Sequence, residues 1–334
     1  MSKPRLYELD FVRAICALGI VIYHFSGKIN ETLYFPFYAF KNGYWGRVLV
    51  TCFFILSGMT LYYHNSSIDD YKLFFVKRIK SIYPSFYLVY IPLFFVNAFL
   101  NKSIFWKGNP LKLVLSILGV DGYFYYITPN YYIIGEWFLG AIILLYILYP
   151  LIVLLVEKTK WVYPLIVILL YVWQTSFSDI FAIDPYHNLI SCVFSFSLGI
   201  YIMKYELWNK IPLTIVSFIL FVLLVVIKIP FLVMYLEKIT GISLFFVLSF
   251  LGVYAVKNEV LKKVIKLLSA VSYEMFLVHH VVILLVVPFF KPNSIPLVIV
   301  CMFITVFVTI IGAFVVNKIS KELIIKKIFV REKT

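Results

Sequence analysis

The chain opens on the apolar run LYELDFVRAICALGIVIYHF (residues 6–25), and this run decides the fold class. An α-helix needs roughly 20 apolar residues to cross the hydrocarbon core of a bilayer, which is the length of this run. Because no small-residue cleavage site ends the run, we interpret it as a retained first membrane helix rather than as a signal peptide.

The composition extends this interpretation to the whole chain. Of the 334 residues, 63% are hydrophobic and 14% are charged, whereas about 25% of a soluble domain is charged. These values exclude a soluble globular enzyme, a disordered chain and a secreted disulfide scaffold. The apolar runs are continuous rather than alternating, which also argues against a transmembrane β-barrel. The sequence therefore predicts an all-α polytopic membrane protein.

Ten apolar runs, separated by charged or turn-rich segments, predict ten membrane helices. They cover about 9–27, 46–63, 80–100, 132–156, 161–175, 187–203, 211–228, 240–256, 270–289 and 295–317. The stretch 111–119 is too short to span, and we expect an interfacial or re-entrant helix there, within an outer loop at 101–131. We interpret residues 1–334 as a single membrane domain whose basic tail, 318–334, lies on anionic lipid.

The distribution of basic residues predicts the orientation. The chain has 30 Lys and Arg against 16 Asp and Glu, a net charge of +14. Most of the basic residues fall in the segments that are inside when the N-terminus is inside, so both termini are expected in the cytoplasm of a cell-membrane protein. The same bias explains the net charge without nucleic acid, which we do not expect as a partner.

The four cysteines lie far apart in apolar runs and lack metal-ligand spacing. We interpret them as buried thiols that behave as small hydrophobic residues, and we expect no metal site. Cys16 lies on the first helix, so a nucleophilic role for this residue stays as an alternative.

Three ionisable residues share the first helix, and such residues are costly inside a membrane. Asp10, Arg13 and His24 lie on one face at 100° per residue. The rise from Arg13 to His24 is about 16 Å, which places Arg13 at the inner mouth and His24 near or beyond the midplane. The alternative is an interfacial Asp–Arg pair with a histidine that is satisfied by a neighbouring helix.

The same run resembles the opening helix of the acyltransferase-3 family of membrane acyltransferases. That helix carries a Leu-Asp-x-x-Arg start and an Arg-x10-His spacing, which here are Leu9, Asp10, Arg13 and His24. Four further blocks resemble the family in the same order. They are CFFILSGMTLYY (52–63), KRIKSIYPSFYL (77–88), EWFLGAIILLYILYP (136–150) and SYEMFLVH (272–279).

Three positions depart from the family pattern. Ser81 stands where the family has a second arginine, with Lys80 beside it, and Ile142 stands where many members carry a glutamate. Glu136 precedes the tryptophan of that block instead, and whether Lys80 and Glu136 act as substitutes stays open. Phe276 replaces a tyrosine.

The resemblance implies an enzyme that moves an acetyl group from cytoplasmic acetyl-CoA to a hydroxyl of a cell-surface or lipid-linked glycan, with no permanently bound cofactor. It implies a catalytic role for His24, which can accept a proton from the acceptor hydroxyl, together with Arg13 and Asp10. Cations at the inner mouth suit the phosphates of the donor. The candidate donor-binding residues are Lys77, Arg78, Lys80 and Ser57.

The candidate acceptor-binding residues are Trp137, Glu136, Tyr273 and His279, and Asp121 and Asn130 of the outer loop are further candidates for sugar hydroxyls. Each motif also has a structural alternative. The basic cluster can serve topology alone, Ser57-Gly58 can be a close helix contact, and Trp137 can be an interfacial residue. His279 can make a structural hydrogen bond between helices.

Two other classes of function fit the composition. One is a transporter or flippase of a polysaccharide or lipid-linked sugar, and the other is an accessory subunit of exopolysaccharide synthesis. The sequence shows no matched Gly/Pro interruptions of the kind that broken transporter helices carry, which favours the enzyme. Membrane lipid is an expected partner in each case, and no oligomeric state is assigned.

Overall fold

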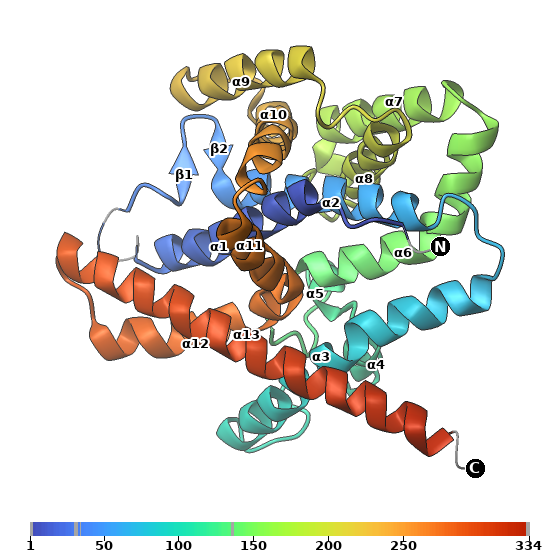
Figure 1. The fold of residues 1–334 in the computed structure, drawn as a ribbon. Helices are drawn as coiled ribbons and strands as arrows, with labels where there is room; N and C mark the ends of the chain where they lie inside the picture. Colours follow the sequence, from blue (N-terminus) through green and yellow to red (C-terminus); the bar gives the residue numbers. More distant parts are fainter. Residues whose placement is uncertain (1–2, 30–32, 34, 135–136, 332–334) are drawn as a thin grey trace.

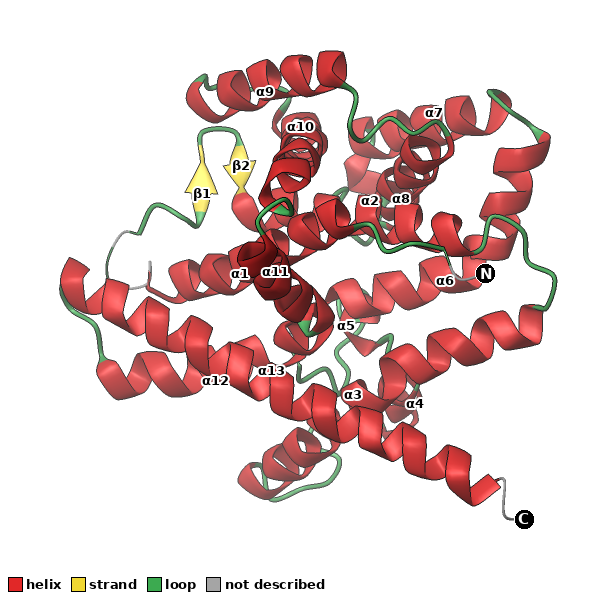
Figure 2. Cartoon of the chain, in the orientation of Figure 1, coloured by secondary structure: helices red, strands yellow, loops and turns green. Residues whose placement is uncertain are grey.

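The computed structural model describes residues 3–29, 33, 35–134 and 137–331, with side chains as far as residue 323. The described residues form α-helices, two 3₁₀ turns and one small β-hairpin (Figures 1 and 2). The first elements are α1 (Tyr7–Ile29), β1 (Ala39–Phe40), β2 (Gly43–Tyr44), α2 (Trp45–His64), α3 (Tyr71–Leu100), η1 (Pro110–Lys112), α4 (Leu113–Ile117), α5 (Asp121–Phe124) and α6 (Trp137–Lys158). The others are α7 (Val162–Ser176), η2 (Ser178–Ile180), α8 (Leu189–Lys204), α9 (Ile211–Val226), α10 (Val233–Ala255), α11 (Glu259–Ala270), α12 (Ser272–Phe290) and α13 (Ile295–Arg331).

Ten of the helices are strongly apolar. Seven of them, α1, α2, α3, α6, α10, α12 and α13, are long and apolar enough to cross a membrane, and α7, α8 and α9 are shorter apolar helices. Each of these ten helices overlaps one of the ten apolar runs identified in the sequence. The prediction of an all-α polytopic membrane protein is therefore confirmed.

Two helices begin earlier than the apolar pattern predicts. Helix α3 begins at Tyr71 rather than near residue 80, because the Asp70 carboxylate caps it by accepting a hydrogen bond from the Leu73 amide at 2.9 Å. Helix α10 begins at Val233 rather than near residue 240. In both cases charged residues that the apolar pattern places in a loop lie on the helix itself.

The segment 111–119 contains only η1 and the five-residue α4, which is far below the length of a span. Helix α11 is an additional short helix with one apolar and one charged face, between α10 and α12. The charge pattern of the sequence predicts an inner basic segment at these residues, without a helix.

Helix α1 occupies the centre of the molecule, where it packs against α2, α10, α11, α12 and α13 (Figure 1). Most of its residues are buried by these neighbours rather than left for lipid. The polar side chains of α1 therefore face other helices rather than lipid. Ionisable residues of membrane helices that have a function are found in such positions.

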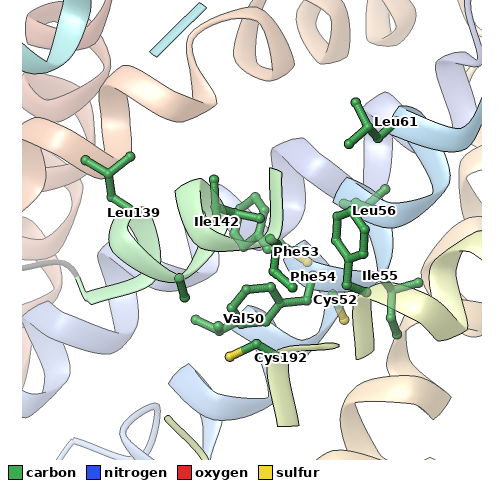
Figure 3. Close-up of a cluster of buried hydrophobic side chains, with 14 of the residues drawn as sticks. Val50, Cys52, Phe53, Phe54, Ile55, Leu56, Leu61, Leu139, Ile142 and Cys192 are labelled. Atoms are coloured by element: carbon green, nitrogen blue, oxygen red, sulfur yellow. The ribbon is translucent and has the colours of Figure 1, made fainter. Parts of the chain in front are cut away.

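The core lies mainly between α2, α6 and α8. Figure 3 shows Phe53 and Phe54 of α2 beside Leu139 and Ile142 of α6, with Cys192 of α8 below them. All four cysteines of the chain are buried and free, as expected of small hydrophobic residues in a membrane protein.

Helices α2 and α8 approach each other through two glycines. A Cβ atom on Gly58 would lie 1.9 Å from the Phe196 carbonyl oxygen, and one on Gly199 would lie 2.1 Å from the Ile55 carbonyl oxygen. Both obstacles are backbone atoms, which cannot rotate away. The Gly58 position of the family-like second block therefore serves a close helix contact, as small residues do in membrane bundles.

We expect Gly58→Ala to destabilise the fold, because the added methyl group forces α2 and α8 apart. Overpacking of this kind costs about 1–3 kcal/mol, so the thermal midpoint of the purified protein should fall clearly, measured as the loss of monodisperse protein after heating. Gly312→Ala in α13 is the matched control, since its Cβ would meet only Val278 Cγ2 at 3.7 Å. Equal midpoints for the two variants would contradict the contact.

Candidate active site

Asp10 lies near the start of α1, and we call the end of the helix bundle that contains it the N-terminal side. The Asp10 carboxylate is buried and accepts hydrogen bonds from Arg5, from the Ser269 hydroxyl at 2.6 Å and from Arg13 at 3.4 Å. Ser269 lies on α11, so this network joins the start of α1 to α11. Asp10 therefore holds Arg13 in place, and it lies about 21 Å along the helix from His24.

A cavity of about 420 Å³ opens on the N-terminal side, between α2, α3 and α6. Its walls are Thr60, Leu61, His64, Asn65, Lys77, Arg78 and Tyr146. The structure thus brings together two of the four residues that the sequence proposed for donor binding, Lys77 and Arg78. Both lie on the first turns of α3, where the early start of the helix places them.

Arg78 is held over two aromatic rings at the wall of this cavity. Its guanidinium carbon lies 5.8 Å from the ring centres of Phe74 and Tyr146. Its Nε atom is buried, and among the described residues it has no hydrogen-bond partner. A buried donor without a partner is costly. Arg78 lines the cavity, where its guanidinium group can donate charge-assisted hydrogen bonds to an anionic ligand. Arg13 also lies close enough to Tyr146 to act on it electrostatically.

Two other donor candidates lie elsewhere. Lys80 is exposed and is not among the residues that line the cavity, and the neighbouring Ser81 hydroxyl donates to the Arg78 carbonyl oxygen at 2.8 Å. Ser57 lies on α2 one residue before the α2–α8 contact, is only half-buried and does not line the cavity.

His24 meets two further histidines in the other half of α1. Its ring centre lies 5.1 Å from that of His279 and 4.3 Å from that of His280, both on α12. The His279 ring is buried, and its Nδ1 lies 2.9 Å from the Phe276 carbonyl oxygen. His279, which was proposed as an acceptor-binding residue, is therefore a direct neighbour of His24.

Aromatic rings lead away from His24 toward the far ends of α2 and α6. The Tyr23 ring lies 4.9 Å from His24 and stacks on Tyr38 at 5.1 Å, and Tyr38 meets Tyr44 at 5.3 Å. The Arg47 guanidinium lies 5.3 Å from the centre of the Tyr44 ring.

The row of rings continues from Arg47 to the start of α6. Arg47 lies 5.1 Å from the centre of the Tyr186 ring, and Tyr186 lies 5.8 Å from Trp137. The Trp137 ring is 4.5 Å from that of His187, which pairs with Asp184. The hydrogen bond from His187 and the nearby Arg47 lower the pKa of Asp184 despite its burial. Trp137 thus belongs to a group of rings and charges that connects to His24.

The remaining acceptor candidates lie apart from this group. The Tyr273 hydroxyl donates to the Ile82 carbonyl oxygen at 3.2 Å, which joins α12 to α3. Glu136 lies outside the described residues. Asp121 and Asn130 are both buried within the loop that follows α3, where the Asn130 amide donates to the Asp121 carbonyl oxygen at 2.9 Å. These two residues stabilise the loop and are not available to sugar hydroxyls from solvent.

Burial raises the pKa of the Asp121 carboxyl from 3.8 to about 6. The folded state therefore keeps the proton at pH values where the unfolded chain has lost it, and stability falls as the pH rises from about 4 to about 6. A shift of this size corresponds to about 3 kcal/mol. We expect Asp121→Asn to remove this part of the pH dependence, measured as the thermal midpoint of the purified protein between pH 4 and pH 7. Exposed Asp69→Asn is the control, and a wild-type-like slope in Asp121→Asn would contradict the assignment.

Sequence reasoning missed several residues of this region. His64 and Tyr146 complete the cavity, but His64 is the last residue of α2 and Tyr146 lies within the apolar run of α6, and neither position carries a signal of its own. Glu237 and Lys238 are buried at the start of α10, where Glu237 pairs with Arg47 at 2.9 Å. They were assigned to an outer segment because the expected span began at residue 240. A rule that flags every ionisable residue within one turn of a span would have found this pair.

Comparison with known proteins assigns the chain to a family. The family model described as an acyltransferase domain, of the acyltransferase-3 type, matches residues 6–317, which is nearly the whole chain. Comparisons with curated proteins and with solved structures find no match. Because the match covers nearly the whole chain, the chain belongs to the acyltransferase-3 family and is a multi-pass membrane acyltransferase.

Proposed function

We propose that this enzyme transfers an acetyl group from cytoplasmic acetyl-CoA to a hydroxyl of a cell-surface or lipid-linked glycan, in the cell membrane. The observation that carries the proposal is the cavity that holds Lys77 and Arg78 on the N-terminal side, together with His24 on the central helix that leads away from it. The charge bias of the loops supports a cytoplasmic position for this side.

The donor site follows from the charges of the cavity. A CoA thioester carries a pyrophosphate and a 3′-phosphate, and the guanidinium fork of Arg78 suits a phosphate that accepts two hydrogen bonds. Lys77 adds a second positive charge to the lining of the cavity. Arg13 adds a third charge close to Tyr146, which is also a lining residue. The pantetheine arm would then extend along α1 from Arg13 toward His24, a rise of about 16 Å.

The proposed reaction is a direct transfer at His24. The neutral imidazole accepts the proton of the acceptor hydroxyl while the hydroxyl oxygen attacks the thioester carbonyl carbon. The new C–O ester bond forms, the C–S bond breaks, and CoA leaves as a thiolate that takes up a proton. Asp10 contributes indirectly in this scheme, by holding Arg13 through its hydrogen bonds.

The acceptor would approach from the side opposite the cavity. The rings of Tyr23, Tyr38 and Trp137 offer flat apolar faces, and Arg47 and His187 offer hydrogen-bond donors beside them. Sites for small molecules combine apolar walls with a few placed polar groups in this manner. A sugar bound there would present its hydroxyl at the His24 end of the row of rings.

The decisive experiment uses the purified protein in detergent or vesicles with acetyl-CoA that is labelled in the acetyl group. We expect release of the CoA thiol and transfer of label to surface glycan from a strain that lacks the gene. NMR of that glycan should show fewer O-acetyl signals than wild-type glycan. If the purified protein releases no thiol with acceptor present but does so when a second protein is added, it is an accessory subunit and the proposal fails. Unchanged O-acetylation in the deletion strain would exclude a glycan acceptor.

A further inference from the structure

Three histidines from two helices converge at one point of the bundle. Each of His24, His279 and His280 offers a ring nitrogen, and these nitrogens all lie within 4.8 Å of one another. In a tetrahedral zinc site, ligand nitrogens at 2.0–2.1 Å from the ion lie about 3.4 Å apart. Side-chain rotations that move each ring nitrogen by about 1 Å therefore suffice to bring the three nitrogens to the spacing of zinc ligands.

The His279 ring is already oriented as a metal ligand would be. Its Nδ1 faces the Phe276 carbonyl oxygen at 2.9 Å and the Met275 carbonyl oxygen at 3.2 Å, so Nδ1 carries the hydrogen and donates it. In the neutral ring the lone pair is then on Nε2. Histidines that bind metals nearly always donate their other ring N–H to a carbonyl or carboxylate, which fixes the tautomer and the ring plane.

The burial of the three rings suits a site that an ion can enter. His279 is fully buried between α1 and α12, whereas His24 and His280 are only partly buried. Two of the three ligands thus retain some exposed surface. The sequence did not predict this site, because His24 is separated from the other two by most of the chain.

The donor set selects the class of ion. Three imidazoles suit zinc, copper and nickel, whereas magnesium and calcium require oxygen ligands. Three histidines also leave a fourth position open for water or another small ligand. We propose that His24, His279 and His280 bind a divalent transition-metal ion, with zinc as the best fit, and that the bound ion stops acyl transfer. The second half rests on the proposed function, because a nitrogen of His24 that binds zinc cannot accept a proton from the acceptor hydroxyl.

Binding is tested directly on the purified full-length protein, without any activity measurement. Co²⁺ serves as the probe, because tetrahedral cobalt has strong visible absorption bands. We expect wild-type protein to develop these bands at micromolar Co²⁺ and to lose them when Zn²⁺ is added. His280→Ala should weaken Co²⁺ binding tenfold or more, a loss of the size that even outer-shell changes cause. His187→Ala, which alters a histidine far from the cluster in sequence, should bind as wild type does.

Inhibition is tested separately, by thiol release from acetyl-CoA with and without Zn²⁺. We expect Zn²⁺ to stop wild-type transfer and chelator to restore it. His280→Ala, measured relative to its own metal-free rate, should need at least tenfold more Zn²⁺ for inhibition. If chelator abolishes activity instead, the ion is required and the inhibitory role is overturned. If neither Co²⁺ bands nor inhibition occur at millimolar metal, the site itself is overturned while the proposed function stands. Cobalt binding by wild type together with full activity of His24→Ala overturns the role of His24 as a base and leaves the site intact.

Discussion

His24→Ala should abolish acyl transfer while the protein still folds and inserts into the membrane. Loss of a general base typically lowers the rate 10²–10⁴-fold. His24 lies half-buried where α1 meets the histidines of α12, so truncation removes a small polar group rather than a core side chain. The measurement is the release of CoA thiol from acetyl-CoA in the presence of acceptor, normalised to folded protein by size-exclusion chromatography.

A second substitution separates a chemical role for His24 from a packing role. His24→Gln keeps a polar side chain of similar reach but cannot accept a proton near neutral pH, so it should be as inactive as His24→Ala. Activity within threefold of wild type in both variants would show that His24 is not the base.

Arg78→Ala should raise the KM for acetyl-CoA with little change in the KM for the acceptor. A charge-assisted hydrogen bond contributes about 1.5–3 kcal/mol, so the expected rise is roughly 10–100-fold. Arg78→Lys keeps the charge but loses the fork that matches two phosphate oxygens, and its donor KM should lie between those of wild type and Arg78→Ala. Steady-state kinetics with the donor varied at saturating acceptor give these values.

Two lysine variants show whether the effect belongs to the cavity. Lys263→Ala removes an exposed charge from α11. Because Lys263 does not line the cavity, this change should leave the donor KM unchanged, and it controls for the loss of surface charge in general. Lys80→Ala tests the expectation from the sequence that Lys80 shares the role of Arg78. Since Lys80 lies outside the cavity, its donor KM should stay within twofold of wild type. Equal effects of Arg78→Ala and Lys263→Ala would assign the basic cluster to topology alone.

The membrane helices could be predicted from the sequence because each one satisfies a local condition. A run of about 20 apolar residues is more stable in lipid than in water whatever its neighbours are. The ends of the spans were less certain, as α3 and α10 show. There the polarity of Lys77 or Glu237 suggested a loop, whereas the cap at Asp70 and the pairing of Glu237 with Arg47 allow the helix to continue.

The candidate site could be predicted only in part. The spacing of Arg13 and His24 along one helix follows from the helical period, and it needs no knowledge of other helices. Lys77 and Arg78 could be proposed from their order after a membrane span, but their separation from Lys80 depends on which side of α3 faces the cavity. That side is decided by the packing of α3 against α13 and α12 and by the stacking of Phe74 on Tyr149 of α6.

The sequence by itself determined the class of the protein, the ten apolar helices and the polar face of α1, since these depend on single residues and on the period of one helix. Only the tertiary structure decided which polar groups meet. It placed Asp10 of α1 against Ser269 of α11, and it brought His279 and His280 to His24 across most of the chain. The physical reason is that hydrogen bonds and ion pairs act over a few ångströms, so they are set by how helices pack and not by their order along the chain.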